Sequence, residues 1–277
     1  MLGIVSPRLS QVSTISHRFF GRVGGTSPHP WTGLNTSFAV RDSPARVEEN
    51  LARVRFQIGV GRRSLFTVNQ VHGNQVRRIL AGDDVDQVAA EAADALFTTE
   101  PSVAVGVRTA DCVPILMTSA DGRCIAAIHA GWRGLAQGVI QSTIDAVDAA
   151  GFPARVWTAA VGPCIGAGAF EVGPEVIQSL FESLGIASSS AGAEQEELQA
   201  TGLVKPGEGD RYHVDLAGWA MRSLLQSGVQ NIERLDICTA SETDNWFSHR
   251  AEKGRTGRQI AVIARTEPPH IDEKTFS

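Results

Sequence analysis

The feature that most constrains the fold of this chain is a series of short apolar runs that are rich in β-branched residues. These runs predict strands at residues 65–71, 102–109, 124–129, 154–161, 235–239 and 259–264. Helical periodicity occurs in three other segments, at residues 43–59, 135–150 and 216–227. Because strand and helix patterns alternate, we expect an α/β fold, a layered sandwich of mixed sheets flanked by helices.

The length of 277 residues is at the upper end for one domain, and we expect a single catalytic domain over residues 1–277. Residues 185–209 are polar, small and rich in helix and strand breakers. A strand pattern resumes at 211–216, so this stretch predicts a mobile surface insertion and not a linker between domains.

Composition excludes several classes of protein. The net charge of −5 does not indicate binding to nucleic acid or to an anionic membrane. A small anionic substrate is still compatible with it, because an acidic chain can contain a local basic pocket. No stretch approaches the about 18 apolar residues that span a bilayer, and the first residues lack a secretory pattern. The four cysteines are widely spaced and include no C-x-x-C, which favours reduced thiols and a cytoplasmic enzyme.

Three polar clusters interrupt the apolar runs. In TVNQVHGNQV, residues 67–76, an apolar run ends at Asn69 and delivers His72 to a turn. Taken alone, this histidine is more often a core or surface residue. In RTADC, Arg108, Asp111 and Cys112 lie between two apolar runs. Burying such polar side chains costs free energy unless they are paired, bind metal or line a cleft. A packed core cysteine is the alternative there.

The third cluster is HAGWRG, in which a predicted strand brings His129 to a glycine loop followed by a helix. Such a loop exposes backbone N–H groups at a helix N-terminus, a natural anion site. Arg133 adds a guanidinium that suits bidentate binding of phosphate. Together His129 and Arg133 favour a functional interpretation over an ordinary turn.

Two further segments carry candidate residues. Cys164 lies among glycines and prolines in residues 160–176. Three interpretations of this cysteine stay open: a nucleophile, a thiol that supports the site, or a packed loop cysteine. Residues 245–263 include Ser248, His249 and Arg250, and then a GRTGR turn. We expect Lys253 and Arg255 to be solvated and Arg258, which leads into a strand, to be held in place.

We expect one open, catalytic metal site formed by His72, Cys112 and His129. Zinc accepts imidazole and thiolate ligands, and a catalytic zinc keeps three protein ligands plus an open position. A multicopper cluster needs many histidines close together, whereas this chain has seven and none in an H-x-H arrangement. The sequence therefore predicts zinc, with copper as the alternative.

Seven stretches carry a resemblance to a known family: GRVGGTSPHPWTGLN, NQVHGNQV, DALFTT, RTADCVPILM, HAGWRG, VGPCIGAGAFEV and FSHRAEKGRTGRQIAVI. From Arg22 to Ile263 the chain resembles the cytosolic laccase-like family named multicopper polyphenol oxidoreductase, now regarded as zinc-dependent purine nucleoside phosphorylases with adenosine deaminase activity. The resemblance implies an α/β sandwich and makes His72, Cys112 and His129 the metal ligands. The chain departs at residues 185–209 and at Ala251, where the family often has arginine.

The resemblance implies purine nucleosides and phosphate as partners: adenosine, inosine, guanosine and 5′-methylthioadenosine would give free base and ribose-1-phosphate. Phosphate candidates are Arg133 and the N–H groups after His129, then Arg22 and Arg250. Asn69 and Cys164 complete the predicted substrate residues. We expect a monomer or small homo-oligomer.

Catalysis also needs a proton carrier and a role for the metal. The metal would polarise the purine or orient phosphate, and would activate water for deamination. Asp111, beside a metal ligand, is the first candidate proton carrier and Glu171 a weaker one.

Three alternatives stay open from the sequence. One is a metal-free Cys/His hydrolase or amidase that edits peptidoglycan precursors, since some members of the family bear that name. The second is a copper-dependent polyphenol oxidoreductase. The third is a nucleotide-binding protein without turnover.

Overall fold

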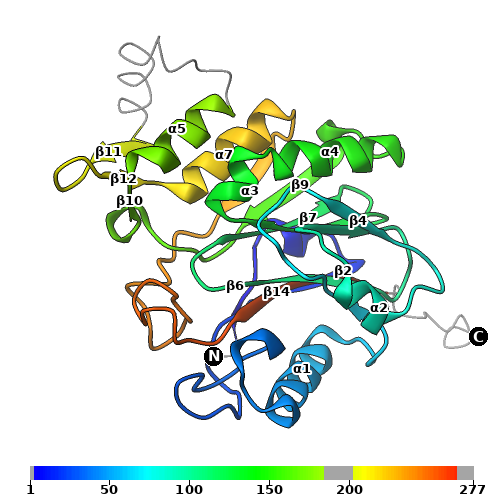
Figure 1. Cartoon of the computed structure of the whole chain (residues 1–277). Helices are drawn as coiled ribbons and strands as arrows, with labels where there is room; N and C mark the ends of the chain where they lie inside the picture. The colour runs from blue at the N-terminus through cyan, green and yellow to red at the C-terminus, as the bar shows by residue number, and fades with distance from the viewer. Residues whose placement is uncertain (1–2, 184–201, 267–277) are drawn as a thin grey trace, which may run out of the picture.

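The computed structural model describes residues 3–183 and 202–266, in which helices and two stacked β-sheets form four layers (Figure 1). One sheet has the strand order β1 (Gly3–Ile4), β2 (Ile15–Phe20), β14 (Gln259–Arg265), β6 (Ala104–Thr109) and β3 (Leu65–Phe66). The other has the order β13 (Asn231–Arg234), β9 (Trp157–Val161), β7 (Val113–Ser119), β8 (Ile125–Ala130), β5 (Ala95–Thr98) and β4 (Val76–Ile79). Both sheets are mixed, which confirms the predicted fold class.

Helices cover the outer faces of the two sheets. The six-stranded sheet carries α3 (Trp132–Ala136), α4 (Val139–Ala149), α5 (Pro174–Glu182) and α7 (Leu216–Gln226). The five-stranded sheet carries α1 (Pro44–Ile58), and α2 (Val85–Ala90) precedes β5. A small antiparallel sheet of β10 (Glu171–Val172), β12 (Tyr212–Val214) and β11 (Val204–Pro206) lies beside α5 (Figure 1).

Strand periodicity explains why the layers stack. In β8, Ala126, Ile128 and Ala130 face the helices, whereas Ile125 and Ala127 face the other sheet. The two faces of β14 are divided in the same way, between the inner core and the core under α1. Strands that bury both faces read as continuous apolar runs, so their sequences predicted strands well.

Local signals also set the helix ends. The predicted helix at 43–59 is confirmed as α1, which begins at Pro44 and ends where Gly59 adopts a φ of 82°. The predicted helix at 135–150 is two helices instead, α3 and α4. Gly138 separates them because it adopts a left-handed φ of 76°, which an unbroken helix cannot contain.

Several predicted boundaries were wrong. The strand predicted at 235–239 is β13 at Asn231–Arg234, and residues 235–239 form only a bridge between Cys164 and Cys238. This strand lies at the sheet edge and is polar, so apolar patterning missed it. The strand predicted at 65–71 is a strand only over β3, with an isolated bridge between Asn69 and Ala92. Residues 154–156 form a 3-10 helix before β9.

The predicted surface insertion at 185–209 is corrected in its last part. Residues 204–206 form β11, which pairs with β12 and buries Val204 completely. Residues 185–201 lie outside the described residues, and the single domain stays a prediction. In the described residues, no helix has the length and apolarity that membrane crossing requires.

The buried His17 leads us to expect that the folded protein is less stable at acid pH. It lies on β2 with 6% of its surface exposed, and its Nε2 accepts the Ser6 N–H at 2.9 Å. Burial lowers the pKa of His17 from 6.5 to about 4. The unfolded chain therefore takes up a proton near pH 6.5 while the folded chain does not, so the free energy of unfolding falls as pH drops from about 7 to 4. The expected loss is about 3 kcal/mol.

Urea unfolding of wild type and His17→Gln at pH 7 and pH 4 measures this loss. Glutamine does not titrate, so the variant should lose less stability than wild type over the same interval. Equal losses in the two proteins would contradict the assignment to His17.

Candidate functional site

The predicted metal ligands meet at one edge of the sandwich, between the two sheets. His72 lies on the link from β3 to β4, and Cys112 on the link from β6 to β7. Each link passes from the five-stranded sheet to the six-stranded one. His129 is the penultimate residue of β8 and shares the inner face with Ile125 and Ala127. The ligand atoms of the three side chains all lie within 4.8 Å of one another.

A carboxylate that the sequence analysis did not single out holds both histidines. Asp94 is fully buried, and its Oδ1 lies 2.7 Å from Nδ1 of His129. The same side chain accepts the backbone N–H groups of Val71, His72 and Gly73 at 3.1, 3.0 and 2.7 Å. Burial would raise the pKa of Asp94, but the bonds from His129 and these N–H groups hold it below its usual range. Asp94 leaves Nε2 of His129 to face Cys112 and His72.

Cys112 is placed by its strained neighbour. Asp111 has a φ of 89°, a left-handed conformation that is uncommon for a residue with a side chain. Its carboxylate accepts the Thr239 hydroxyl and the Arg250 N–H, both at 2.7 Å, and its carbonyl accepts the Ile165 N–H at 2.9 Å. These bonds offset the backbone strain. Asp111 lines the cleft, yet both of its carboxylate oxygens already have donors.

The thiol and the buried imidazole are electrostatically coupled. Burial would raise the pKa of Cys112, but His129 and His72 lower it to about 6. Burial would lower the pKa of His129, but the Cys112 thiolate and Asp94 raise it to about 9. At neutral pH the thiolate form is therefore favoured, which is the form that binds metal or acts as a nucleophile.

The glycines of HAGWRG allow this close approach. A Cβ atom added to Gly131 would lie 3.0 Å from Sγ of Cys112 and 3.1 Å from Cδ2 of His72. One added to Gly134 would lie 3.0 Å from the carbonyl oxygen of Gly73. A side chain at position 131 would crowd two of the three ligands, so the motif preserves the donor group as well as the turn.

The donor group opens into a cleft of about 910 Å³. Its walls include arginines that form no ion pair with a carboxylate in residues 3–183 and 202–266: Arg63, Arg108, Arg133, Arg250 and Arg258. The aromatic side chains of Phe38, Trp132 and Phe170 also line it. Although the whole chain is acidic, this cleft is suited to an anion that carries a flat ring.

Arg108 and Arg258 are the half-buried guanidiniums of the cleft. Arg108 donates its Nε to the Thr36 carbonyl at 2.7 Å, and burial lowers its pKa to about 10. Arg258 donates NH1 to the carbonyls of Thr256 and Gly257, and burial lowers its pKa against the charges of Cys112 and Asp111. Both side chains stay charged at neutral pH. A desolvated cation without a carboxylate partner favours an anionic ligand.

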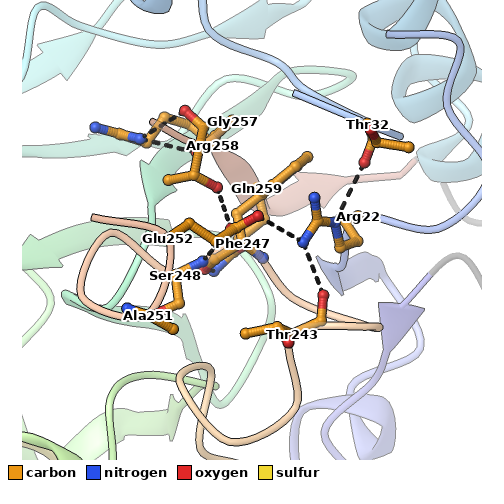
Figure 2. Close-up of polar contacts among 11 residues, drawn as sticks. Arg22, Thr32, Thr243, Phe247, Ser248, Ala251, Glu252, Gly257, Arg258 and Gln259 are labelled. Atoms are coloured by element: carbon orange, nitrogen blue, oxygen red, sulfur yellow. Dashed lines mark hydrogen bonds and ion pairs between the residues drawn. The ribbon is translucent and has the colours of Figure 1, made fainter. Parts of the chain in front are cut away.

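An ion pair outside the cleft holds the loop that supplies part of its wall. Arg22 lies 3.0 Å from Glu252 and also donates to the carbonyls of Thr243 and Thr32 at 2.8 and 3.2 Å. Figure 2 shows these contacts around the loop. Glu252 in turn accepts the Ser248 N–H at 3.2 Å and the Thr256 hydroxyl. This loop brings His249, Arg250 and Arg258 to the cleft.

The network places Arg22 outside the cleft, and its phosphate role stays a prediction. Its guanidinium is occupied by the loop, and it lines a separate hollow with Thr243 and Asp244. The structure therefore assigns it a supporting position and not one in the cleft.

The other predicted substrate residues divide in the same way. Asn69, Arg133 and Arg250 line the cleft. Arg133 is exposed, with its guanidinium 4.3 Å from the Trp132 ring centroid. Arg250 donates to the carbonyls of Ala169 and Glu171 at 3.2 and 3.0 Å.

Cys164 and Glu171 do not line the cleft. Cys164 is buried, and burial raises the pKa of its thiol; its substrate role stays a prediction. The carboxylate of Glu171 accepts the Glu208 N–H at 3.0 Å, away from the donor group. Lys253 and Arg255 are exposed, as expected.

Known proteins resemble this chain in sequence and in fold. The family model described as multi-copper polyphenol oxidoreductase laccase matches residues 16–266. The purine nucleoside phosphorylase YfiH of Escherichia coli (strain K12) is 33% identical over 263 residues, covering 95% of this chain and 99% of that protein. A purine nucleoside phosphorylase of Deinococcus radiodurans is 35% identical over 251 residues, covering 90% and 88%.

Solved structures agree with the sequence relatives. YlmD from Geobacillus stearothermophilus has a TM-score of 0.84 at 26% identity and covers 96% of this chain and 99% of its own. Neisseria meningitidis protein NMB0706 has a TM-score of 0.78 at 30% identity and covers 92% and 96%. With a match that extends over nearly all described residues, the chain belongs to the multi-copper polyphenol oxidoreductase laccase family.

Proposed function

We propose that this protein is a purine nucleoside phosphorylase whose metal ligands are His72, Cys112 and His129. The observation that carries the proposal is that this donor group lines a cleft that arginines and aromatic side chains also line. Relatives over most of the chain bear the name purine nucleoside phosphorylase. Its cytoplasmic location and its state as a monomer or small homo-oligomer stay predictions from the sequence.

The donor set fits zinc. One thiolate and two imidazoles, with ligand atoms within 4.8 Å of one another, are ligands that zinc accepts, and a set of three protein ligands is typical of a catalytic zinc site. The Asp94 carboxylate orients His129 as metal-bound histidines require. Copper is the alternative that the family name implies. A multinuclear copper centre needs further ligand groups, and the described residues contain no second cluster of three such donors.

Arg108 and Arg258 are the phosphate residues that we propose, with Arg133 and Arg250 at the outer wall. The first two guanidiniums are half-buried, lack carboxylate partners and lie on the same cleft as Cys112. Two planar cations can bind separate edges of one phosphate. Phe38 and Phe170 line the same cleft, and we propose that their aromatic rings contact the purine.

Phosphorolysis at this site is a single displacement at the sugar carbon. A phosphate oxygen forms a bond to C1′ of the ribose, the bond from C1′ to the purine breaks, and the electron pair leaves with the base. Arginine charges hold the phosphate and offset its charge as the bond forms. A bound zinc ion would supply Lewis-acid chemistry at the base of the cleft. Asp111 positions Cys112, so we propose His249, which lines the cleft, as the proton carrier for the leaving base.

Adenosine deamination is the second activity that we propose for this centre, because its open ligand position would serve water activation too. A metal-free hydrolase is the other candidate, and one observation favours it. In that case Cys112 would be the nucleophile, His129 its base, and Asp94 the carboxylate that orients the base. Chelation separates the two cases, since a thiol hydrolase keeps its activity without metal.

The direct test is turnover of adenosine with phosphate by the metal-loaded protein, followed by chromatography. Adenine and ribose-1-phosphate support the phosphorylase, and inosine supports deamination. A chelator should abolish both products, and zinc should restore them. Neither product from fully metal-loaded protein would refute the proposed function.

Replacing Asp94 by Asn should weaken zinc binding about 10- to 100-fold, because the amide cannot hold His129 and the 71–73 backbone as the carboxylate does. Competition with a chromogenic chelator measures the affinity. Asp148→Asn, an exposed acid on α4, is the matched control and should bind zinc as wild type does. Equal affinity in Asp94→Asn and the control would show that Asp94 does not support the metal ligands.

Removing Arg108 should affect phosphate more than nucleoside. Arg108→Gln should raise the KM for phosphate roughly 10- to 100-fold, the cost of about 1.5–3 kcal/mol for a charged hydrogen bond. Arg133→Ala should raise it less, because that side chain is exposed to water. Arg46→Gln is the control, since this exposed side chain pairs with Glu49 and does not line the cleft. An unchanged phosphate dependence in Arg108→Gln would remove this residue from the phosphate site.

A further inference from the structure

Two cysteines outside the metal group lie side by side behind it. Cys164 follows β9 and Cys238 follows β13, and the two are direct partners in an isolated parallel bridge. The Cys164 N–H donates to the Ile237 carbonyl at 3.3 Å, and the Thr239 N–H donates to the Cys164 carbonyl at 2.9 Å. This pattern places the two cysteines opposite each other, with side chains on the same face.

The separation of such partners suits a disulfide. Neighbouring strands lie about 4.7–4.9 Å apart. Disulfide-bonded cysteines have Cα atoms about 4.4–6.8 Å apart. Both cysteines are free thiols here.

The two thiols differ in reactivity. Cys238 is partly exposed, and its Sγ accepts the Gly166 N–H at 3.1 Å and the Ser241 hydroxyl at 3.3 Å. Burial would raise the pKa of Cys238, but these hydrogen bonds lower it. Cys164 is buried with 4% of its surface exposed, and burial raises the pKa of its thiol. A partly exposed thiol with a lowered pKa beside a buried thiol is the arrangement of a reacting and a resolving cysteine.

We propose that Cys164 and Cys238 form a site of reversible oxidation by hydroperoxides, with Cys238 as the reacting thiol and Cys164 as the resolving one. The Cys238 sulfur attacks the terminal oxygen of the hydroperoxide. The O–O bond breaks, the alkoxide leaves as an alcohol with the thiol proton, and Cys238 becomes a sulfenic acid. Cys164 then attacks the Cys238 sulfur, the S–O bond breaks, and hydroxide leaves as water with the Cys164 proton. Two thiols lose two electrons and the hydroperoxide gains them.

The oxidised pair would act on the metal ligand through Asp111. The residue after Cys238, Thr239, donates its hydroxyl to the Asp111 carboxylate, and the residue after Cys164, Ile165, donates its N–H to the Asp111 carbonyl. Asp111 in turn holds the strained backbone that presents Cys112. A disulfide draws the two sulfur atoms to about 2.05 Å and so shifts both anchors together. Formation of the bond does not depend on the proposed function.

Oxidation of the full chain tests the site. Protein loaded with Zn²⁺, which protects Cys112, is treated with a small excess of hydrogen peroxide and digested for mass spectrometry. Wild type should yield a Cys164–Cys238 cross-linked peptide with two fewer hydrogen atoms, and dithiothreitol should remove the link. Cys124→Ser is the matched control, because Cys124 is buried and burial raises its pKa to about 12, so it should cross-link like wild type.

Two variants assign the roles of the thiols. Cys164→Ser should leave a sulfenic acid on Cys238 that dimedone traps, and Cys238→Ser should give neither the link nor a dimedone adduct at Cys164. Both cysteines still reduced in oxidised wild type, or a link to Cys112 or Cys124 instead, would overturn the proposal. A dimedone adduct on Cys164 in place of Cys238 would overturn the assigned order.

The coupling to Asp111 has its own readout. Cross-linked protein should bind zinc about tenfold more weakly than reduced protein, the lower end of what altered outer contacts cost a metal site. Dithiothreitol should restore the affinity. Unchanged affinity in fully cross-linked protein would overturn the coupling, whatever the outcome of the phosphorylase assay.

Discussion

The candidate site depends on the hydrogen bonds that one buried carboxylate accepts. Asp94 joins the imidazole of His129 to the backbone of the link that carries His72, so it fixes two ligands from segments more than fifty residues apart in the chain. A buried carboxylate is costly without such donors. With these donors, the carboxylate restricts the movement of both histidines. It also favours the imidazole orientation in which Nε2 of His129 faces the thiol. Cys112 completes the group because Asp111 accepts three bonds that keep its own left-handed backbone in place.

The layered architecture explains why the ligands are distant in sequence and close in space. Strands of the two sheets alternate along the chain, so a link that leaves one sheet for the other must cross the edge of the inner core. His72 and Cys112 lie on two such links, and His129 ends a strand at the same edge. Backbone at a crossing cannot pair in either sheet. Positive φ values at His72 and Asp111, of 61° and 89°, are the local cost of these turns.

How far the sequence predicts the molecule follows from this geometry. Strands buried on both faces and helices with glycine ends were predictable, since apolar runs and caps are local signals. The edge strand β13 was missed because half-exposed, polar residues lack that signal.

The three candidate metal ligands could be predicted from their residue types, whereas the residues that hold them in place could not. Asp94 looks like any acid before an apolar run, and only the pairing of β5 with β8 reveals what it holds. Arg22 and Cys164 carried the right chemistry for the cleft, but the chain directs them to a neighbouring loop and to the core.

Charge in the cleft links the metal and the anion. The acidic chain places half-buried guanidiniums beside a thiolate, and Arg258 is held partly by the charges of Cys112 and Asp111. A divalent cation on the thiolate would neutralise that attraction and leave the arginines with an excess of positive charge. Under the proposed function, metal binding therefore strengthens the field that attracts phosphate, and bound phosphate strengthens the metal site in return, because coupling between two ligands is reciprocal. Under the proposed function, a metal held by His72, Cys112 and His129 would therefore make the cleft a stronger anion site than the metal-free protein offers.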